Sequence, residues 1–153
     1  MAFKTSRYGK PYALVRGTLA KVSFNVSHSG DHGLIAVASE GRIGVDAEER
    51  RPRRDLDRDI RSLFAPAERN EFERLNRDQR LNLFYDLWTM KEALVKADGA
   101  GLALDTARFE LPVAMVRGSR SAVLKIPARP LTSWRLERCG DARFAAAHAQ
   151  EVG

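Results

Sequence analysis

The sequence predicts one compact α+β domain, in which strands come before and after a helical middle. Up to residue 46, apolar and polar residues alternate, as they do on half-buried strands. From about residue 60 to residue 98, apolar residues recur every three or four positions, as on helices with one buried side. After Leu104 the alternation returns. Strands and helices that occupy separate stretches of a chain are typical of the α+β class.

Three strands are expected in the first part of the chain. The first carries apolar residues in alternation with polar ones, and its expected buried side consists of Val22, Phe24 and Val26. Residues 34–38 and 43–46 predict two more strands. The polar, glycine-bounded stretch 27–33 predicts the turn between the first two. We expect the three strands to form a meander, with Asp46 at the end of the third.

Residues 49–59 are almost entirely charged and are expected to be exposed. Three aspartates at 55, 57 and 59 have the spacing of the start of a calcium-binding loop. The sixth position of that loop is Ile60 rather than glycine, and the twelfth is Pro66 rather than glutamate, so we reject this interpretation. No aromatic residue lies among the arginines of this stretch, which favours a solvated loop over a nucleic-acid-binding patch.

Helices are expected in the middle of the chain. Three apolar residues on one side indicate a short helix: Ile60, Leu63 and Phe64. Pro66 suits the first turn of a second helix. The longest helix is expected from Gln79 to Ala97, because Gly99 lies where a helix would end. Four strands are expected after the helices, at residues 108–111, 122–126, 133–136 and 143–147.

The composition suits a globular protein. The chain has 153 residues, of which 44% are hydrophobic, enough for one domain with a core of ordinary size. No apolar run approaches the roughly 20 residues that span a bilayer, so no membrane is expected as a partner, and no secretory signal is visible. Cys139 is the only cysteine, so an intramolecular disulfide and a zinc site are not expected, whereas cytoplasmic residence is.

The chain is basic, with a net charge of +6 and 20 arginines among its 26 basic residues. Such a charge favours polyanionic or acidic partners, which include nucleic acid, a phosphorylated cofactor and an acidic protein. A solvated arginine-rich surface is the other interpretation, and charge alone does not decide. No nucleic-acid-recognition motif is present, so nucleic acid is not expected as a partner.

Glu92 and Lys96 are four residues apart on the longest predicted helix. They therefore share one face and lie about 6 Å apart along the axis. Trp88 is one turn earlier on the same face. A charged pair beside a large aromatic residue indicates either a functional site or an ordinary surface ion pair.

Asp46 and Glu48 are two residues apart at the end of a predicted strand, so both point to one face, with Cα atoms about 6.5 Å apart. Two carboxylates repel each other unless a cation lies between them, and oxygen ligands favour Mg²⁺. Taken alone, such a pair is more often a solvated turn. Glu92 is a candidate third carboxylate, and Lys91 and Lys96 are candidates for opposing phosphate charge.

Two further basic residues lie in predicted turns. His28 is in the polar stretch 27–33, and Lys10 lies between Gly9 and Pro11. Each could bind an anion. The alternative for His28 is a hydrogen bond to the backbone, and the alternative for Lys10 is simple exposure to solvent.

Together these residues form an ordered set that resembles the 4′-phosphopantetheinyl transferase superfamily, in its larger, surfactin-synthetase-activator type. Five motifs in family order cover roughly residues 8–104. They are YGKPY (8–12), FNVSHSG (24–30), IGVDAE (43–48), FYDLWTMKEALVK (84–96) and GLAL (101–104).

The resemblance implies a transferase of the holo-[acyl-carrier-protein] synthase kind. Such an enzyme moves the 4′-phosphopantetheine arm of coenzyme A to a serine of an apo acyl or peptidyl carrier protein and releases adenosine 3′,5′-bisphosphate. By the family's motifs, Asp46, Glu48 and Glu92 would hold Mg²⁺, and Glu92 would take the proton of the serine. Lys96 and Lys91 would contact the phosphates.

The resemblance also implies where coenzyme A lies. Gly9, Lys10 and Pro11 would be at its adenine and 3′-phosphate end, with Ser27 and His28 nearby.

Enzymes of the larger type consist of two similar lobes. Residues 1–42 correspond to the tail of the first lobe and residues 43–153 to the second, and we expect the two parts to form one globular unit. Three explanations stay open: a fragment, a chain that restores the first lobe's surface by forming a homo-oligomer, or a reduced member with weak or no activity. In the last case the chain would be a silent lobe that binds coenzyme A or a carrier protein.

Overall fold

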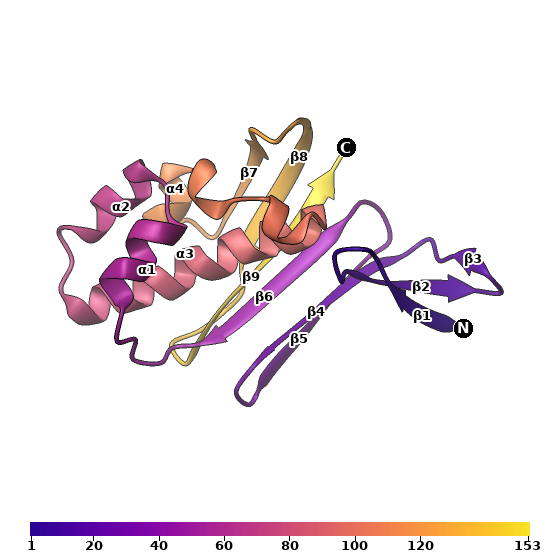
Figure 1. The fold of residues 1–153 in the computed structure, drawn as a ribbon, viewed down its shortest axis with the longest axis horizontal. Coiled ribbons are helices and arrows are strands. Elements are labelled where there is room, and N and C mark those ends of the chain that lie inside the picture. Colours follow the sequence, from indigo (N-terminus) through magenta and orange to yellow (C-terminus); the bar gives the residue numbers. More distant parts are fainter.

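A computed structural model describes all 153 residues and shows an α+β fold built around one antiparallel sheet (Figure 1). The order of the strands in this sheet is β6-β9-β8-β7. Their bounds are β6 Ile43–Glu49, β7 Ser121–Ile126, β8 Arg129–Arg138 and β9 Phe144–Val152. The long helix α3, Arg77–Asp98, packs across β6, β9 and β8. The predicted fold class is confirmed.

Helix α3 begins two residues before the predicted start because a capping box forms there. The side chain of Asn76 accepts a hydrogen bond from the backbone N–H of Gln79, and the Gln79 side chain accepts one from the N–H of Asn76. The helix ends at Gly99, which has a φ of 80° and therefore the left-handed conformation that glycine adopts readily. None of the helices, α3 included, combines the length and the apolar character that a membrane crossing needs.

Shorter helices lie beside α3 and close the core (Figure 1). They are α1 Leu56–Leu63, α2 Pro66–Phe72 and α4 Val113–Val116, with 3-10 turns η1 at Gly101–Ala103 and η2 at Thr106–Arg108. Among them, α4 lies next to β7. Pro66 is in the first turn of α2, as predicted. The core is a cluster of 23 buried hydrophobic residues, and every one lies at Ile60 or later in the chain. Before Ile60 the other buried hydrophobic residues are few, and three of them lie on β6: Ile43, Val45 and Ala47.

Three of the four strands expected after the helices are present, and each is longer than predicted. The strand expected at 108–111 is wrong. Thr106–Arg108 is a 3-10 turn, and the backbone beyond it bonds to buried side chains instead of to a neighbouring strand. The carbonyl of Phe109 accepts from Lys91, and the N–H of Leu111 donates to Glu68. Alternation of apolar residues alone did not reveal these side-chain partners.

Residues before the main sheet form two small sheets. Strands β1 (Ala2–Thr5), β2 (Pro11–Val15) and β3 (Thr18–Leu19) form one, and the hairpin of β4 (Ser23–Ser29) and β5 (His32–Ala38) forms the other. Two predictions are wrong here. The polar stretch 27–33 is mostly strand, with only Gly30 and Asp31 in the turn, and β6 pairs with β9 rather than completing a meander with β5.

The hairpin is joined to β6 by side chains in place of a backbone ladder. Three polar residues of β4 each accept a hydrogen bond from a backbone N–H of β6, at 2.9–3.1 Å. The donor N–H groups belong to Val45, Ala47 and Glu49, and the acceptors are the side chains of Asn25, Ser27 and Ser29 in the same order. The three N–H groups on the edge of β6 that does not face β9 thereby have partners.

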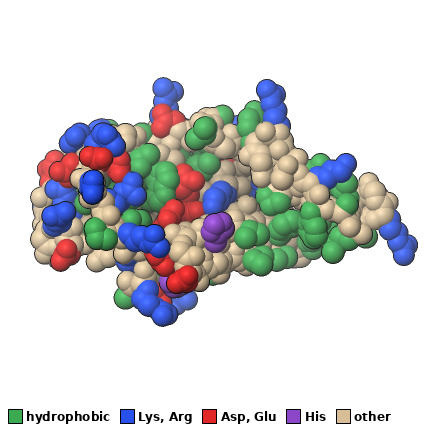
Figure 2. Space-filling view, turned by 60° about the horizontal axis from the view of Figure 1, so that its bottom comes forward, with side chains coloured by type: hydrophobic (Ala, Val, Ile, Leu, Met, Phe, Trp, Pro, Cys, Tyr) green, Lys and Arg blue, Asp and Glu red, His purple; other side chains and the backbone are tan.

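This junction reverses the predicted burial of β4. Asn25 and Ser27 are buried, whereas Val26 is exposed. On the paired strand β5, Ile35 and Val37 are exposed on the same face as Val26. Figure 2 shows apolar side chains gathered on the part of the molecule that carries the first five strands. The alternating pattern predicted the strand correctly, but its polar side faces the protein.

Strand β6 and helix α3 approach each other closely at Gly44. A Cβ atom at this position would overlap the carbonyl oxygen of Ala93 and the backbone nitrogen of Ala97. Neither atom belongs to a flexible side chain, so the helix or the strand would have to move. Gly44 therefore sets how near α3 lies to the sheet.

We expect Gly44→Ala to lower the free energy of unfolding by about 1–3 kcal/mol or more, the range for overpacked interiors. Urea unfolding followed by circular dichroism measures the change. Gly33→Ala is the matched control, since the nearest atom to an added Cβ there is 4.0 Å away. Equal unfolding midpoints for the two variants would contradict the close contact at Gly44.

Candidate functional site

A pocket of about 630 Å³ lies between the turn before β2, the second half of α3 and the segment that follows α3. It brings together two motifs that are more than 80 residues apart in the chain. Gly9, Lys10 and Pro11 line one side, and Glu92 and Lys96 line another. The ammonium of Lys10 donates to the carbonyl of Ala97 at 2.7 Å, which attaches this turn to the end of α3. Burial lowers the pKa of Lys10 to about 8, and the nearby charge of Arg42 lowers it too.

Glu92 is the half-buried carboxylate of this pocket. Burial raises its pKa, and the negative charge of Asp46 raises it further, while Lys96 works in the opposite direction. Glu48 adds a smaller increase. A carboxylate with a raised pKa accepts a proton more readily than an ordinary one, which is what a general base requires.

Asp46 lies behind Glu92 on β6 and is buried. Its Oδ1 accepts hydrogen bonds from the ammonium of Lys96 at 2.6 Å and from the hydroxyl of Ser27 at 3.1 Å. Lys96 also donates to Ser27 Oγ at 3.2 Å. The pKa of Asp46 is raised, chiefly by burial, while the charge and the hydrogen bond of Lys96 oppose that change. Helix α3, strand β6 and strand β4 therefore each contribute one side chain to a single charged network.

Glu48 is two residues after Asp46 on β6 and is half-buried. Its Oε2 accepts from the hydroxyl of Ser29 at 3.0 Å. Because the charge of Glu48 raises the pKa of both Asp46 and Glu92, the three predicted carboxylates lie in one neighbourhood.

The structure does not gather three acidic, histidine or cysteine side chains into a ready metal cage. One oxygen of Asp46 is bound by Lys96, but the other, Oδ2, is buried without a hydrogen-bond partner. Three neighbouring carboxylates, one of which has an orphaned buried oxygen, form an oxygen-only donor set that suits a hard cation such as Mg²⁺. The residues present therefore fit the ion that the sequence predicts, although they are not arranged around one.

Lys91 lies outside the pocket, which corrects its expected contact with phosphate. Its side chain is fully buried, and the ammonium bonds to Glu68 at 2.7 Å and to two backbone carbonyls. Burial lowers the pKa of Lys91, and the charge of Glu68 opposes that change. Lys91 and Glu92 are neighbours in the chain, but successive residues of a helix point about 100° apart.

Ser27 and His28 are adjacent on β4 and point to opposite faces of the strand. Ser27 faces β6 and bonds to Asp46 and Lys96. His28 is exposed on the same side as Val26, which borders the pocket, but His28 itself does not line it. Of the two, the structure places Ser27 in the charged network.

Several residues of the site were missed from the sequence. Asn25 lines the pocket and accepts from the N–H of Val45, and Asp105 with Thr106 forms part of the wall after α3. The sequence does contain a pattern that indicates Asn25: polar residues occur at every second position, Asn25, Ser27 and Ser29, and therefore share one face of β4. No sequence pattern marked the wall after α3.

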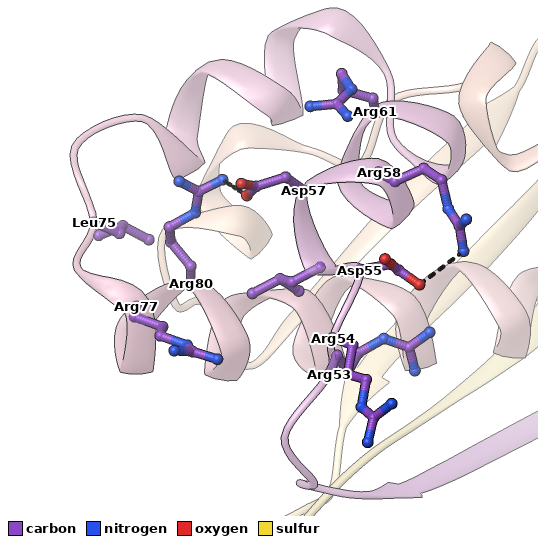
Figure 3. A pocket seen from close by; sticks show the side chains of 10 residues that line it. Arg53, Arg54, Asp55, Asp57, Arg58, Arg61, Leu75, Arg77 and Arg80 are labelled. Atoms are coloured by element: carbon purple, nitrogen blue, oxygen red, sulfur yellow. Dashed lines mark hydrogen bonds and ion pairs between the residues drawn. The ribbon is translucent and has the colours of Figure 1, made fainter.

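A second pocket, of about 510 Å³, lies beside α1 and is lined by six arginines and two aspartates (Figure 3). Arg53, Arg58 and Arg80 are paired with Asp59, Asp55 and Asp57 respectively. The other three arginines make no ion pair: Arg54, Arg61 and Arg77. Residues 49–59 are mostly exposed, as predicted, but they are not all loop, because α1 begins at Leu56.

Helix α1 separates the two pockets. Its residues Ser62 and Leu63 line the first pocket, and Arg58 and Arg61 line the second. An acidic molecule held by these arginines would lie next to the pocket that contains Glu92.

A family model described as the 4′-phosphopantetheinyl transferase superfamily matches residues 42–148. A 4′-phosphopantetheinyl transferase of Bacillus subtilis is 37% identical over 112 residues, which are 72% of this chain and 47% of that protein. The 4′-phosphopantetheinyl transferase AcpT of Escherichia coli K12 is 40% identical over 76 residues, 50% of this chain and 39% of that protein. The chain thus spans less than half the length of these curated relatives.

A solved structure shares the fold. It is a holo-(acyl-carrier-protein) synthase from Bacillus anthracis in complex with coenzyme A (3′,5′-ADP), with a TM-score of 0.55 and 20% sequence identity. The match covers 73% of this chain and 96% of that one.

We expect Glu92→Gln to stabilise the protein at neutral pH. The folded pKa of Glu92 is raised, so the unfolded chain ionises first as the pH rises above about 4.3, and ionisation then costs the folded state stability. Glutamine does not ionise. Thermal unfolding should give Glu92→Gln a melting temperature a few degrees above wild type at pH 7.5, with the difference shrinking toward pH 4. Glu40→Gln, at an exposed position, should show neither effect. A less stable Glu92→Gln at pH 7.5 would contradict the assignment.

Proposed function

The chain belongs to the 4′-phosphopantetheinyl transferase superfamily, and on that premise we propose that it carries the catalytic part of such an enzyme. The reaction is the Mg²⁺-dependent transfer of the 4′-phosphopantetheine arm of coenzyme A to a serine of an apo acyl or peptidyl carrier protein. The observation that supports it is the single pocket in which Gly9, Lys10 and Pro11 meet Glu92 and Lys96.

In the proposed reaction, the serine hydroxyl forms a bond to the phosphorus that carries pantetheine. The bond from that phosphorus to the bridging oxygen breaks, and adenosine 3′,5′-bisphosphate leaves with the electron pair. Glu92 takes the serine proton, directly or through a water molecule, since it is half-buried in the pocket with a raised pKa. The ammonium of Lys96, held by Asp46 and Ser27, opposes the negative charge of the phosphates.

Asp46, Glu48 and Glu92 would hold Mg²⁺. When bound, the ion supplies neutralisation of phosphate charge, which phosphoryl transfer mainly requires. At the other end of the pocket, Lys10 would contact the 3′-phosphate and the turn around it the adenine. With a pKa of about 8, the Lys10 ammonium is mostly protonated at neutral pH.

A silent lobe that binds coenzyme A or a carrier protein is the alternative. The raised pKa of Glu92 and its place in the pocket favour activity over this alternative. Cytoplasmic residence and self-association stay predictions from the sequence.

Mass spectrometry of an apo carrier protein incubated with coenzyme A, Mg²⁺ and this chain tests the function. We expect a gain of one phosphopantetheine arm per carrier, and no gain with Glu92→Gln because the base is lost. Glu40→Gln should behave as wild type. If coenzyme A raises the melting temperature but no carrier gains mass while a full-length relative succeeds in parallel, the silent lobe is supported instead.

We further propose that the arginine pocket receives the acidic carrier protein (Figure 3). Its three unpaired arginines offer charge to a partner, and only α1 lies between this pocket and the catalytic one. Charges at the edge of an interface mainly govern encounter and specificity.

We therefore expect Arg61→Gln combined with Arg77→Gln to raise the KM for the carrier several-fold. Two exposed ion pairs of about 0.2–1 kcal/mol each allow an effect of that size. The affinity for coenzyme A should stay as in wild type, and the loss should shrink as salt is added. Arg120→Gln combined with Arg135→Gln, at exposed positions outside the pocket, is the matched control. An equal rise in KM for both pairs would argue against docking at this pocket.

A further inference from the structure

Lys91 is one of the largest fully buried side chains of the protein, although it neighbours a pocket residue in the chain. Its ammonium has three acceptors: the carbonyls of Thr106 at 2.6 Å and Phe109 at 2.7 Å, and Glu68 Oε2 at 2.7 Å. The ring of Phe109 lies 4.6 Å from the ammonium and adds a cation–π contact. Every hydrogen of the ammonium is therefore used inside the protein, and none faces the pocket.

Glu68 completes this arrangement from the first turn of α2. Its Oε2 accepts from the N–H of Ala65 at 2.9 Å, and its Oε1 accepts from the N–H of Leu111 at 2.8 Å. The pair thus joins α3, the start of α2 and both ends of the segment 106–111. That segment belongs to no sheet, so side chains hold it in place where a strand would have ladder bonds.

Thr106, the first residue of this segment, and Asp105 before it line the catalytic pocket and form one of its walls. The Thr106 hydroxyl donates to the carbonyl of Leu63 at 2.9 Å, so α1 holds the wall from its other side. Lys91 bonds the backbone of Thr106, and the next residue along α3, Glu92, points into the pocket. One turn of α3 therefore sets the position of both the carboxylate and the wall.

We propose that Lys91 and Glu68 are positioning residues, which hold the wall at 105–106 at a fixed place relative to Glu92 so that the pocket keeps the shape that coenzyme A requires. The part concerning coenzyme A rests on the proposed function. Removing one partner leaves the other charge buried and unpaired, so each single substitution should loosen the segment more than the loss of one ordinary hydrogen bond would.

The test combines Lys91→Met, Glu68→Gln and the double variant with the matched control Lys125→Met, which removes an exposed lysine on β7. Hydrogen exchange, without any ligand, should become faster at residues 106–111 in each single variant. The amide of Leu111, which donates to Glu68, should respond most. Calorimetry with coenzyme A, under conditions where each variant is folded, should show affinity reduced about tenfold, as for other groups that orient a site from behind. Lys91→Arg should recover part of the affinity.

The outcomes separate the two proposals. Variants that are less stable but keep wild-type exchange at 106–111 and wild-type affinity for coenzyme A would overturn the positioning role. If a variant does not fold, hydrogen exchange of the wild-type protein with and without coenzyme A is the test. Coenzyme A should slow the exchange at residues 105–111. Binding of coenzyme A without slower exchange there would also overturn the positioning role. A wild-type chain that does not bind coenzyme A counts against the proposed function, while the exchange measured without ligand still reports on the pair.

Discussion

The close contact between Gly44 and the backbone of α3 is the constraint on which the rest of the structure depends. It leaves no room for a side chain between β6 and the helix at Ala93 and Ala97. Two residues further along β6, this spacing allows Asp46 to reach Lys96 with a bond of 2.6 Å. Because Glu92 is one turn before Lys96 on the same helix face, it is held next to the carboxylates of β6. The fold buries like charges together here: burial raises the pKa of Asp46 and of Glu92, and the neighbouring carboxylates raise both further.

Features that depend on local sequence were predictable, whereas features that depend on distant partners were not. The three longer helices and the strands of the main sheet follow from apolar spacing, Pro66 and Gly99. The pairing of β6 with β9 does not, because nothing in either strand specifies its partner. In the site, Glu92 and Lys96 were recognisable from their spacing on one helix face. The burial of Lys91 was not, since its acceptors lie in Glu68 and in a segment up to 18 residues away.

Helix α3 thus has two charged faces with opposite environments. On one face, Glu92 is half-buried and its pKa is raised by burial and by neighbouring carboxylates. On the other face, Lys91 is satisfied by Glu68 and by backbone carbonyls. A charged group that lacks hydrogen-bond partners inside the protein can take part in chemistry or bind a ligand. A charged group whose hydrogen bonds are all made inside the protein stabilises the fold instead. Neighbouring residues of one motif can therefore have entirely different tasks.

The junction between β4 and β6 has a consequence for how such a protein changes over generations. Hydrogen bonds of an ordinary sheet belong to the backbone and are the same for every sequence. Here they belong to the side chains of Asn25, Ser27 and Ser29, so three codons encode the junction of β4 with β6. Single-base changes can weaken, shift or release that attachment while leaving the four-stranded sheet untouched. The junction therefore depends on which side chains β4 carries, whereas the ladder of the four-stranded sheet does not depend on side-chain identity.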